Sequence, residues 1–181
     1  MQAQWAAREG HLSRYVTEQP SYSILQRGIE SHVLPVTEQY GLGVLAWSPL
    51  ASGWLSGAIR ENREITTNRS AFMPQRFDTA IPANRAKLDA VEQLATVAEQ
   101  AGLTMIQLAL GFVTAHPGVT SALIGPRTMD HLQSQLAAAD TVLTADILDA
   151  IDAIVAPGVD LAADEKFDTP PALLDPALRR R

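Results

Sequence analysis

Residues 42–57, LGVLAWSPLASGWLSG, are the stretch from which the fold can be worked out. The stretch begins with apolar and β-prone residues at 44–47, and then breaks at Ser48 and Pro49. The small residues Ala51-Ser52-Gly53 follow in the loop. We therefore predict a strand that ends in a small-residue loop, an arrangement that presents backbone N–H groups to an anion.

The composition is that of an ordinary globular domain. The chain has 181 residues, of which 46% are apolar and 19% charged, which suffices for one domain with a core. Its net charge of −6 argues against nucleic acid or an anionic membrane surface as the main partner. The absence of cysteine excludes disulfides, thiolate metal sites and a cysteine nucleophile.

Targeting signals are not apparent in the sequence. The first ten residues, MQAQWAAREG, lack both a basic region and an apolar core, so they do not resemble a signal peptide. No apolar run approaches the roughly 18 residues that a membrane span needs. We therefore expect a soluble cytoplasmic protein.

Hydrophobic periodicity and capping residues predict the order of the elements. Residues 1–10 are expected to be the last part of a helix that ends at Gly10. Further helices are expected at 29–40 with Pro35 in the first turn, at 85–101, at 104–115, from Thr128 or Asp130 to about 139, and at 144–154. Short strands are expected at 15–18, 42–47 and 119–124. Because helices separate the strands, we predict parallel strands with right-handed crossovers. The fold class is therefore α/β, with about three parallel βα units plus extra C-terminal helices.

Two segments fall outside this regular pattern. Residues 60–84 are too long for a simple connector, so they form either a mobile loop over a pocket or a variable surface insertion. Residues 157–181 are rich in Pro, Asp and Arg, and we expect a loose C-terminal tail there.

Several common motifs are absent or misleading. GLGVLA at residues 41–46 matches a dinucleotide fingerprint, but here a helix precedes the glycines and a strand follows, the reverse of what that fingerprint requires. We interpret Gly41 as a helix C-cap. The four histidines lack metal-site spacing, so no metal ligand is assigned. No nucleophile elbow and no pair of acids for glycoside chemistry can be identified.

Polar and aromatic residues follow each of the three predicted strands. They lie at 19–23, 47–53 and 125–128, and ligands of parallel α/β folds bind at this end of the strands. Trp47 is either a core residue or a platform that stacks on a flat ring. Arg127 precedes a helix, so it either binds phosphate or makes a surface ion pair.

Together, three stretches resemble the aldo-keto reductase family. They are EQPSYSIL at 18–25, GVLAWSPLASGWLSG at 43–57, and HPGVTS at 116–121 with residues 122–136. The resemblance covers about residues 1–156 and implies part of a TIM-type (β/α)8 barrel, in which the three strands would be the sixth to the eighth. It also implies NADP(H) as cofactor and reduction of aldehydes and ketones.

The resemblance assigns binding roles to residues at the three strand ends. Gln19 would hydrogen-bond the nicotinamide carboxamide, and Trp47 would stack on the nicotinamide ring. The pyrophosphate would lie along Ser48, Pro49, Leu50, Ala51 and Ser52. The adenosine end would meet Gly125 and Arg127 at its phosphate and His131 and Gln135 near the adenine. The family often has a carboxylate and an Asn where this chain has Ser134 and Gln135, which weakens the expected adenine contacts and the preference for NADP over NAD.

The family's catalytic Asp, Tyr, Lys and His come from the first four barrel strands, which have no counterpart here. No catalytic residue is therefore assigned. We expect the C-terminal part of an aldo-keto reductase that is inactive in isolation, the carbonyl substrate being that of the full-length relative. The alternatives are a non-enzymatic nucleotide-binding or redox-sensing module and a non-functional remnant. Unpaired barrel edges also predict self-association.

Overall fold

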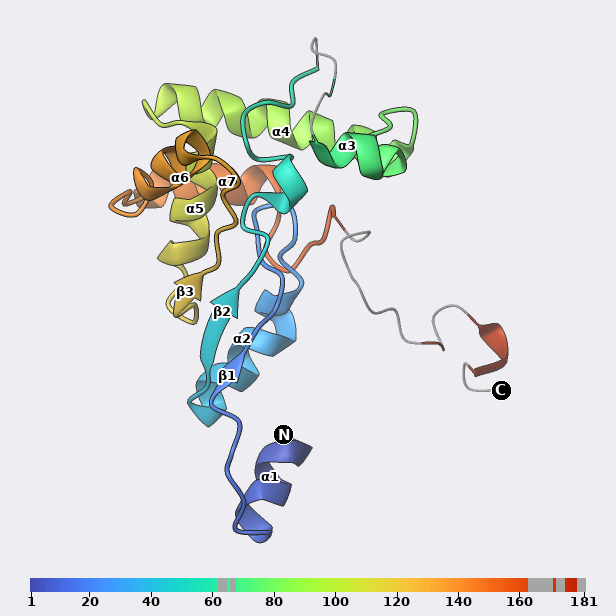
Figure 1. Cartoon of the computed structure of the whole chain (residues 1–181), viewed down its shortest axis with the longest axis vertical. Helices are drawn as coiled ribbons and strands as arrows, with labels where there is room; N and C mark the ends of the chain where they lie inside the picture. The colour runs from blue at the N-terminus through green and yellow to red at the C-terminus, as the bar shows by residue number, and fades with distance from the viewer. Residues whose placement is uncertain (62–64, 66–67, 163–170, 172–174, 179–181) are drawn as a thin grey trace.

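A computed structural model describes residues 1–61, 65, 68–162, 171 and 175–178. Within these residues the chain forms seven α-helices, three strands and short 3-10 turns (Figure 1). The helices are α1 (Gln2–Glu9), α2 (Ile29–Tyr40), α3 (Asn68–Phe72), α4 (Pro82–Gln100), α5 (Met105–Ala115), α6 (Met129–Leu136) and α7 (Ala145–Ile154). The strands are β1 (Thr17–Glu18), β2 (Gly43–Ala46) and β3 (Ser121–Ala122), and the 3-10 turns are η1 (Ala51–Gly53), η2 (Pro74–Arg76) and η4 (Pro176–Leu178).

The three strands form one parallel sheet in the order β1-β2-β3. Thr17 pairs with Gly43 on one side of the central strand, and Leu45 pairs with Ser121 on the other. This topology confirms the prediction of an α/β fold with parallel βα units. Each outer strand has a sheet partner on one side only among the described residues. The predicted self-association through these edges stays a prediction.

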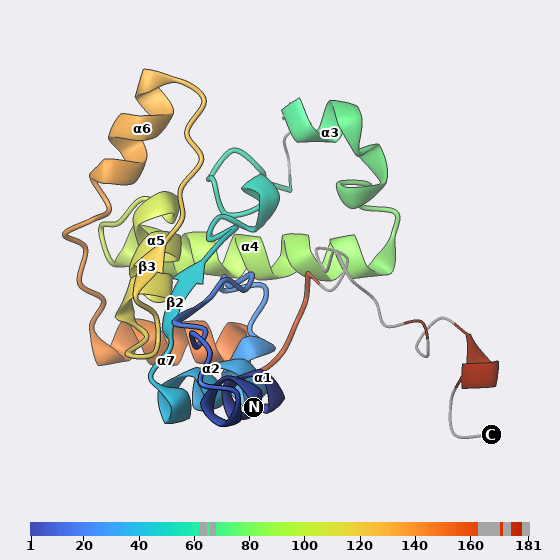
Figure 2. The same ribbon diagram turned by 60° about the horizontal axis from the view of Figure 1, so that its bottom comes forward.

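Helices pack against the sheet, in which β2 has buried residues while β1 is exposed, and they supply much of the core. α2 packs against β2, α5 against β3, and α4 against both α5 and α7 (Figures 1 and 2). The largest fully buried apolar side chains come from the connection between β1 and α2, from β2, from the segment after β2 and from α4, α5 and α7. They are Tyr22, Ile24, Leu25, Val44, Trp54, Leu55, Ile59, Val91, Leu94, Leu108 and Ile151.

Capping residues fix two helices where the sequence predicted them. Gly41 ends α2 with a φ of 61°, a left-handed conformation that glycine adopts without strain. Helix therefore precedes Gly41 and strand follows it, which confirms that GLGVLA is not a dinucleotide fingerprint. At the start of α5, Thr104 and Gln107 form a reciprocal capping box.

Other boundaries differ from the prediction. α4 begins at Pro82 rather than residue 85, because proline is well suited to the first helical position. β1 and β3 have only two residues each, since an outer strand is held on one side and Pro20 offers no N–H. Pro35 lies in the middle of α2 and not in its first turn.

The segment between residues 60 and 84 is more regular than a loop. Its described part contains α3 and η2, while residues 62–64 and 66–67 lie outside the described residues. A cavity of about 360 Å³ lies between this segment and α4, and its lining includes Arg60, Ile65, Phe77 and Arg85. Both alternatives for this segment, a mobile loop over a pocket and a variable surface insertion, stay predictions.

No single helix in the described part of the chain has both the length and the apolar character to cross a membrane. α4 and α5 satisfy the length and composition test only as a pair, and a bend of 93° separates them.

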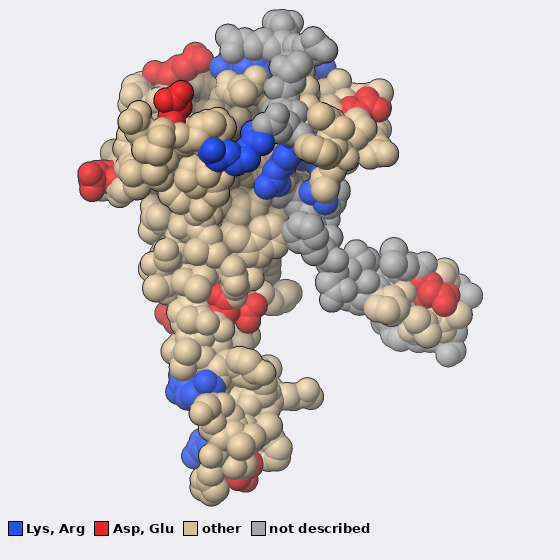
Figure 3. Space-filling model, in the orientation of Figure 1, with Lys and Arg blue, Asp and Glu red and all other residues tan. Residues whose placement is uncertain are grey.

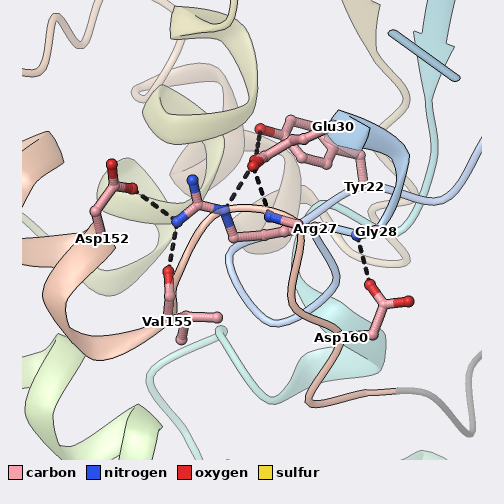
Figure 4. Close-up of polar contacts among 8 residues, drawn as sticks. Tyr22, Arg27, Gly28, Glu30, Asp152, Val155 and Asp160 are labelled. Atoms are coloured by element: carbon pink, nitrogen blue, oxygen red, sulfur yellow. Dashed lines mark hydrogen bonds and ion pairs between the residues drawn. The ribbon is translucent and has the colours of Figure 1, made fainter. Parts of the chain in front are cut away.

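Arg27 lies at the centre of a buried polar network that joins distant parts of the chain (Figure 4). Its guanidinium is 2.8 Å from Glu30, 2.7 Å from Asp152 in α7 and 2.5 Å from the carbonyl oxygen of Val155. It also lies over the Phe112 ring, 5.0 Å from the centroid. Burial alone would lower the pKa of Arg27, but the bonds to Glu30 and Asp152 outweigh it and raise the pKa.

The beginning of the predicted tail belongs to this network. The amide of Gly158 donates to Glu30 at 3.0 Å, and Asp160 accepts from the amide of Gly28 at 2.6 Å. Ala162 is fully buried, and its amide donates to the carbonyl of Leu25. Residues 157–162 are thus packed against the β1–α2 connection, whereas most residues beyond 162 lie outside the described part.

We predict that Arg27→Met lowers the free energy of unfolding by about 3–5 kcal/mol, because it leaves the largely buried carboxylate of Glu30 and the Val155 carbonyl without their partner, while Asp152 is 41% exposed and is solvated instead. Urea denaturation of both proteins measures this loss. Arg85→Met is the matched control, since the Arg85 side chain is about half exposed and pairs at the surface. Equal midpoints for the wild type and Arg27→Met would contradict the prediction.

Candidate functional site

The carboxyl ends of the three strands meet at one edge of the sheet. The amide of Trp47 donates to the carbonyl of Pro20 at 3.0 Å, and the amide of Tyr22 donates to the carbonyl of Trp47 at 3.1 Å. On the other side, the amide of Leu123 donates to the carbonyl of Ala46 at 2.7 Å. The three segments that the sequence singled out are therefore brought to the same edge.

Gln19 and Trp47 are accessible at this edge. Gln19 directly follows β1 and is exposed, and Trp47 directly follows β2 and is half-buried. Both backbone polar groups of Trp47 are held by residues 20 and 22, so the position of its side chain is fixed by the sheet. Trp47 is not a fully buried core residue, so part of its side chain is accessible at this edge.

The turn after Trp47 has a strained backbone. Ser48, Ala51 and Ser52 have φ values of 58°, 46° and 56°, and Gly53 has a φ of 105°. A left-handed conformation costs a non-glycine residue roughly 1–2 kcal/mol. Such strain persists where the surrounding structure enforces it, and it clusters at ligand sites. The strained turn therefore indicates a candidate ligand-binding segment.

Several amides of the turn donate within the turn itself. The amide of Ala51 donates to the carbonyl of Ser48 at 2.8 Å, and the amide of Ser52 donates to the Ser48 hydroxyl at 3.2 Å. The amide of Gly53 donates to the carbonyl of Leu50. An anion that approaches Ser52 would replace the Ser48 hydroxyl as the acceptor of the Ser52 amide. The Ser48 hydroxyl can then rotate and itself donate to the anion. Pro49 and Ala51 are buried and support the turn from behind.

Arg69 is a candidate residue that the sequence did not reveal. It belongs to α3, and its guanidinium donates to the Ser52 hydroxyl at 2.9 Å. Figure 3 shows basic side chains gathered over η1, between α3 and α6. The sequence shows only that an arginine follows the small-residue loop in a long segment. No local pattern indicates that this segment folds back to place Arg69 next to Ser52.

The predicted adenosine-binding residues lie around the start of α6. Gly125 and Arg127 are exposed in the connection from β3, and a side chain at 125 would meet open space. Thr128 caps α6, its hydroxyl accepting the His131 amide at 3.2 Å. His131 is exposed and Gln135 half-buried. The geometry leaves these side chains accessible, and their roles stay predictions.

Tyr22 lies close to the site but does not supply an acid to it. Its hydroxyl donates to Glu30 at 2.7 Å in the Arg27 network (Figure 4). Burial raises the pKa of Tyr22 above its ordinary value, and the hydrogen bond to Glu30 raises it further. The proton of Tyr22 is thus retained and directed into the core. Among the described residues, no group of three or more His, Asp or Glu is arranged to hold a metal ion.

Comparisons with known proteins identify the family. The model of the aldo/keto reductase family matches residues 1–156. The chain is 36% identical over 149 residues to the uncharacterized oxidoreductase YrpG of Bacillus subtilis, which covers 82% of this chain and 43% of that protein. It is 33% identical over 147 residues to a putative voltage-gated potassium channel subunit beta of Schizosaccharomyces pombe (77% and 42%), and 33% identical over 143 residues to protein tas of Escherichia coli (79% and 40%).

This chain belongs to the aldo/keto reductase family. Proteins of this family are oxidoreductases that generally use NAD(P)H, and the family fold is a (β/α)8 barrel. The parallel three-stranded sheet and its helices are consistent with part of such a barrel. The chain spans less than half the length of the curated relatives that it matches.

We predict that Ser52→Gly raises the free energy of unfolding by about 1 kcal/mol, because glycine relieves the left-handed strain at φ 56°. Chemical denaturation tests this. Ser134→Gly, inside helix α6, is the control and should lower stability by about 0.5–1 kcal/mol. If both substitutions destabilise the protein to the same extent, the strain that we assign to the turn is not present.

Proposed function

We propose that this chain supplies the cofactor-binding part of an NADP(H)-dependent oxidoreductase that reduces aldehydes or ketones. The observation that carries the proposal is the strained turn at 48–53, located at the carboxyl end of the central strand in a member of this family. Ligands of parallel α/β folds bind at this end of the strands, and strained backbone is retained where it serves a ligand.

The nicotinamide end of the cofactor would lie over the first two strand ends. Gln19 would hydrogen-bond the carboxamide, and Trp47 would stack on the ring. The exposure of Gln19 and the half-exposed Trp47 support this placement. The bonds from Trp47 to residues 20 and 22 would keep the platform rigid, which reduces the entropy cost of orienting the ring.

The pyrophosphate would lie along the turn. The hydroxyls of Ser48 and Ser52 and the amide of Leu50 are the groups that the turn offers, because the amide of Ala51 already donates to the carbonyl of Ser48, and Arg69 adds a positive charge at Ser52. A guanidinium matches the geometry of phosphate oxygens and can bind two of them. The basic side chains gathered over η1 in Figure 3 support an anionic ligand at this position.

The adenosine end would lie near the start of α6. Gly125 would allow close approach of the ligand, and Arg127 would pair with the adenosine phosphate beside the helix N-terminus. His131 and Gln135 would contact the adenine. The preference for NADP over NAD depends on Arg127 meeting the 2′-phosphate.

The bound cofactor would supply the hydride that reduces the carbonyl carbon, and the residues of this chain would hold and orient it. Proton transfer to the carbonyl oxygen needs an acid, and neither the sequence nor the described residues supply one in a family motif. We therefore propose that the 181-residue chain alone binds the cofactor without reducing a carbonyl substrate. The substrate and the cytoplasmic localisation stay predictions.

A second candidate is a nucleotide-binding module that senses cofactor without turnover. Relatives of this chain include proteins named as an oxidoreductase and as potassium channel β subunits. The same cofactor-binding residues could therefore serve two kinds of protein. Binding without turnover by this chain agrees with both candidates, whereas reduction of a carbonyl compound by an assembled full-length relative favours the first.

We predict that NADPH quenches the tryptophan fluorescence of the full chain through contact with Trp47. Trp47→Phe should lose most of this quenching, because Trp5 is exposed on α1 and Trp54 is buried in the core. Isothermal titration calorimetry gives the affinity, and the absorbance of NADPH with a simple aldehyde reports turnover.

Trp5→Phe is the matched control, since it removes a tryptophan outside the proposed site. Absence of NADPH binding to the folded wild-type chain would contradict the proposed function. Measurable aldehyde reduction by the chain alone would contradict the proposal that it binds without turnover.

A further inference from the structure

Lys87 is a charged side chain that no part of the proposed function uses. It lies on α4 and is fully buried, with a relative exposure of 0%. Its ammonium is 5.2 Å from the centroid of the Trp54 ring. A buried ammonium costs several kcal/mol unless its surroundings compensate it. The indole face is such a compensation, and a desolvated cation–π contact contributes about 2 kcal/mol.

Trp54 contacts both this lysine and a second ring. Phe77 stacks on it with ring centroids 5.4 Å apart and an interplanar angle of 17°. One turn before Lys87, buried Asn84 donates to the carbonyls of Gln75 and Asp78 and so fixes the segment that carries Phe77. α4, this segment and Trp54 therefore form one packed unit.

Trp54 is also the end of the strained turn. Its amide donates to the carbonyl of Ala51 at 3.0 Å, and the next amide, of Leu55, donates to the carbonyl of Leu50 at 3.2 Å. Both acceptors belong to the residues that would line the pyrophosphate. The left-handed conformation of Ala51 and Ser52 needs support from neighbouring structure, because the strained residues themselves do not favour it.

We propose that Lys87 is a positioning residue for the anion-binding turn, acting through its contact with Trp54. Lys87 holds the indole of Trp54 in place, the backbone amide of Trp54 donates to the carbonyl of Ala51, and the turn keeps its left-handed shape when no ligand is bound. This inference rests on the proposed function, since the anion is the cofactor pyrophosphate. It adds a buried residue of α4 to a site otherwise built from the strand ends.

The test measures NADPH affinity by calorimetry for the full chain with Lys87→Met, Trp54→Phe and the double substitution. Lys87→Met keeps the length of the side chain and removes its charge. We expect an affinity about tenfold weaker for Lys87→Met and a smaller loss for Trp54→Phe, which keeps an aromatic ring. The double variant should be about as weak as Lys87→Met, because both substitutions break the same contact.

Val91→Ala is the matched control, because Val91 is fully buried one helical turn further along α4 and carries no charge. It should lower stability and leave the affinity within about twofold. If Lys87→Met does not fold, Trp54→Phe alone decides, and unchanged affinity would overturn the inference.

The outcomes separate the two proposals. A wild type that does not bind NADPH overturns the proposed function together with the inference. If the wild type binds NADPH and Lys87→Met loses no more affinity than the Val91→Ala control, the inference alone is overturned. Additive losses in the double variant also overturn it, since Lys87 would then act independently of Trp54.

Discussion

Arg27 joins two parts of the chain that are far apart in the sequence, the connection between β1 and α2 and the end of α7, and the packing around the sheet depends on this contact. Its guanidinium donates to Asp152 in α7 and to the carbonyl of Val155, which directly follows α7. Glu30 accepts hydrogen bonds from the Tyr22 hydroxyl and from the Gly158 amide. Buried charges are tolerated only where every group is satisfied, so the network fixes one arrangement of these segments. The same connection between β1 and α2 bonds the backbone of Trp47, which links the core network to the edge where the cofactor would lie.

The edge itself combines rigid and strained parts. Trp47 is held by regular hydrogen bonds of the sheet, whereas Ser48, Ala51 and Ser52 keep a conformation that costs energy. Such a turn keeps its conformation because buried structure supports it, here Trp54 in contact with Lys87 and Phe77. The stability lost in the turn is consistent with a site selected for binding rather than for folding. Arg69 on the accessible side and Lys87 on the buried side bring two cations to the same short stretch.

Much of the fold follows from local patterns in the sequence. The caps Gly41 and Thr104 marked α2 and α5, the 3.6-residue period of the apolar residues predicted α4, and alternation of strands with helices predicted a parallel sheet. The outer strands were overestimated because β-propensity does not report whether a partner strand is present. Arg27, Arg69 and Lys87 could not be assigned, since their partners lie on other elements and no spacing in the sequence encodes those contacts. The strand-end residues came from the resemblance to the aldo-keto reductases, and the structure adds which of them are accessible.

The central claim is that the strand ends and the turn form one cofactor-binding edge in a chain of the aldo/keto reductase family. Amide hydrogen exchange of the full chain, followed by mass spectrometry with and without excess NADPH, tests it most directly. The account predicts slower exchange at residues 47–53 and 125–131 when NADPH is present, and unchanged exchange in α1, which lies away from that edge (Figure 1). Unchanged exchange in both segments, or protection confined to the cavity between residues 60 and 88, would contradict it.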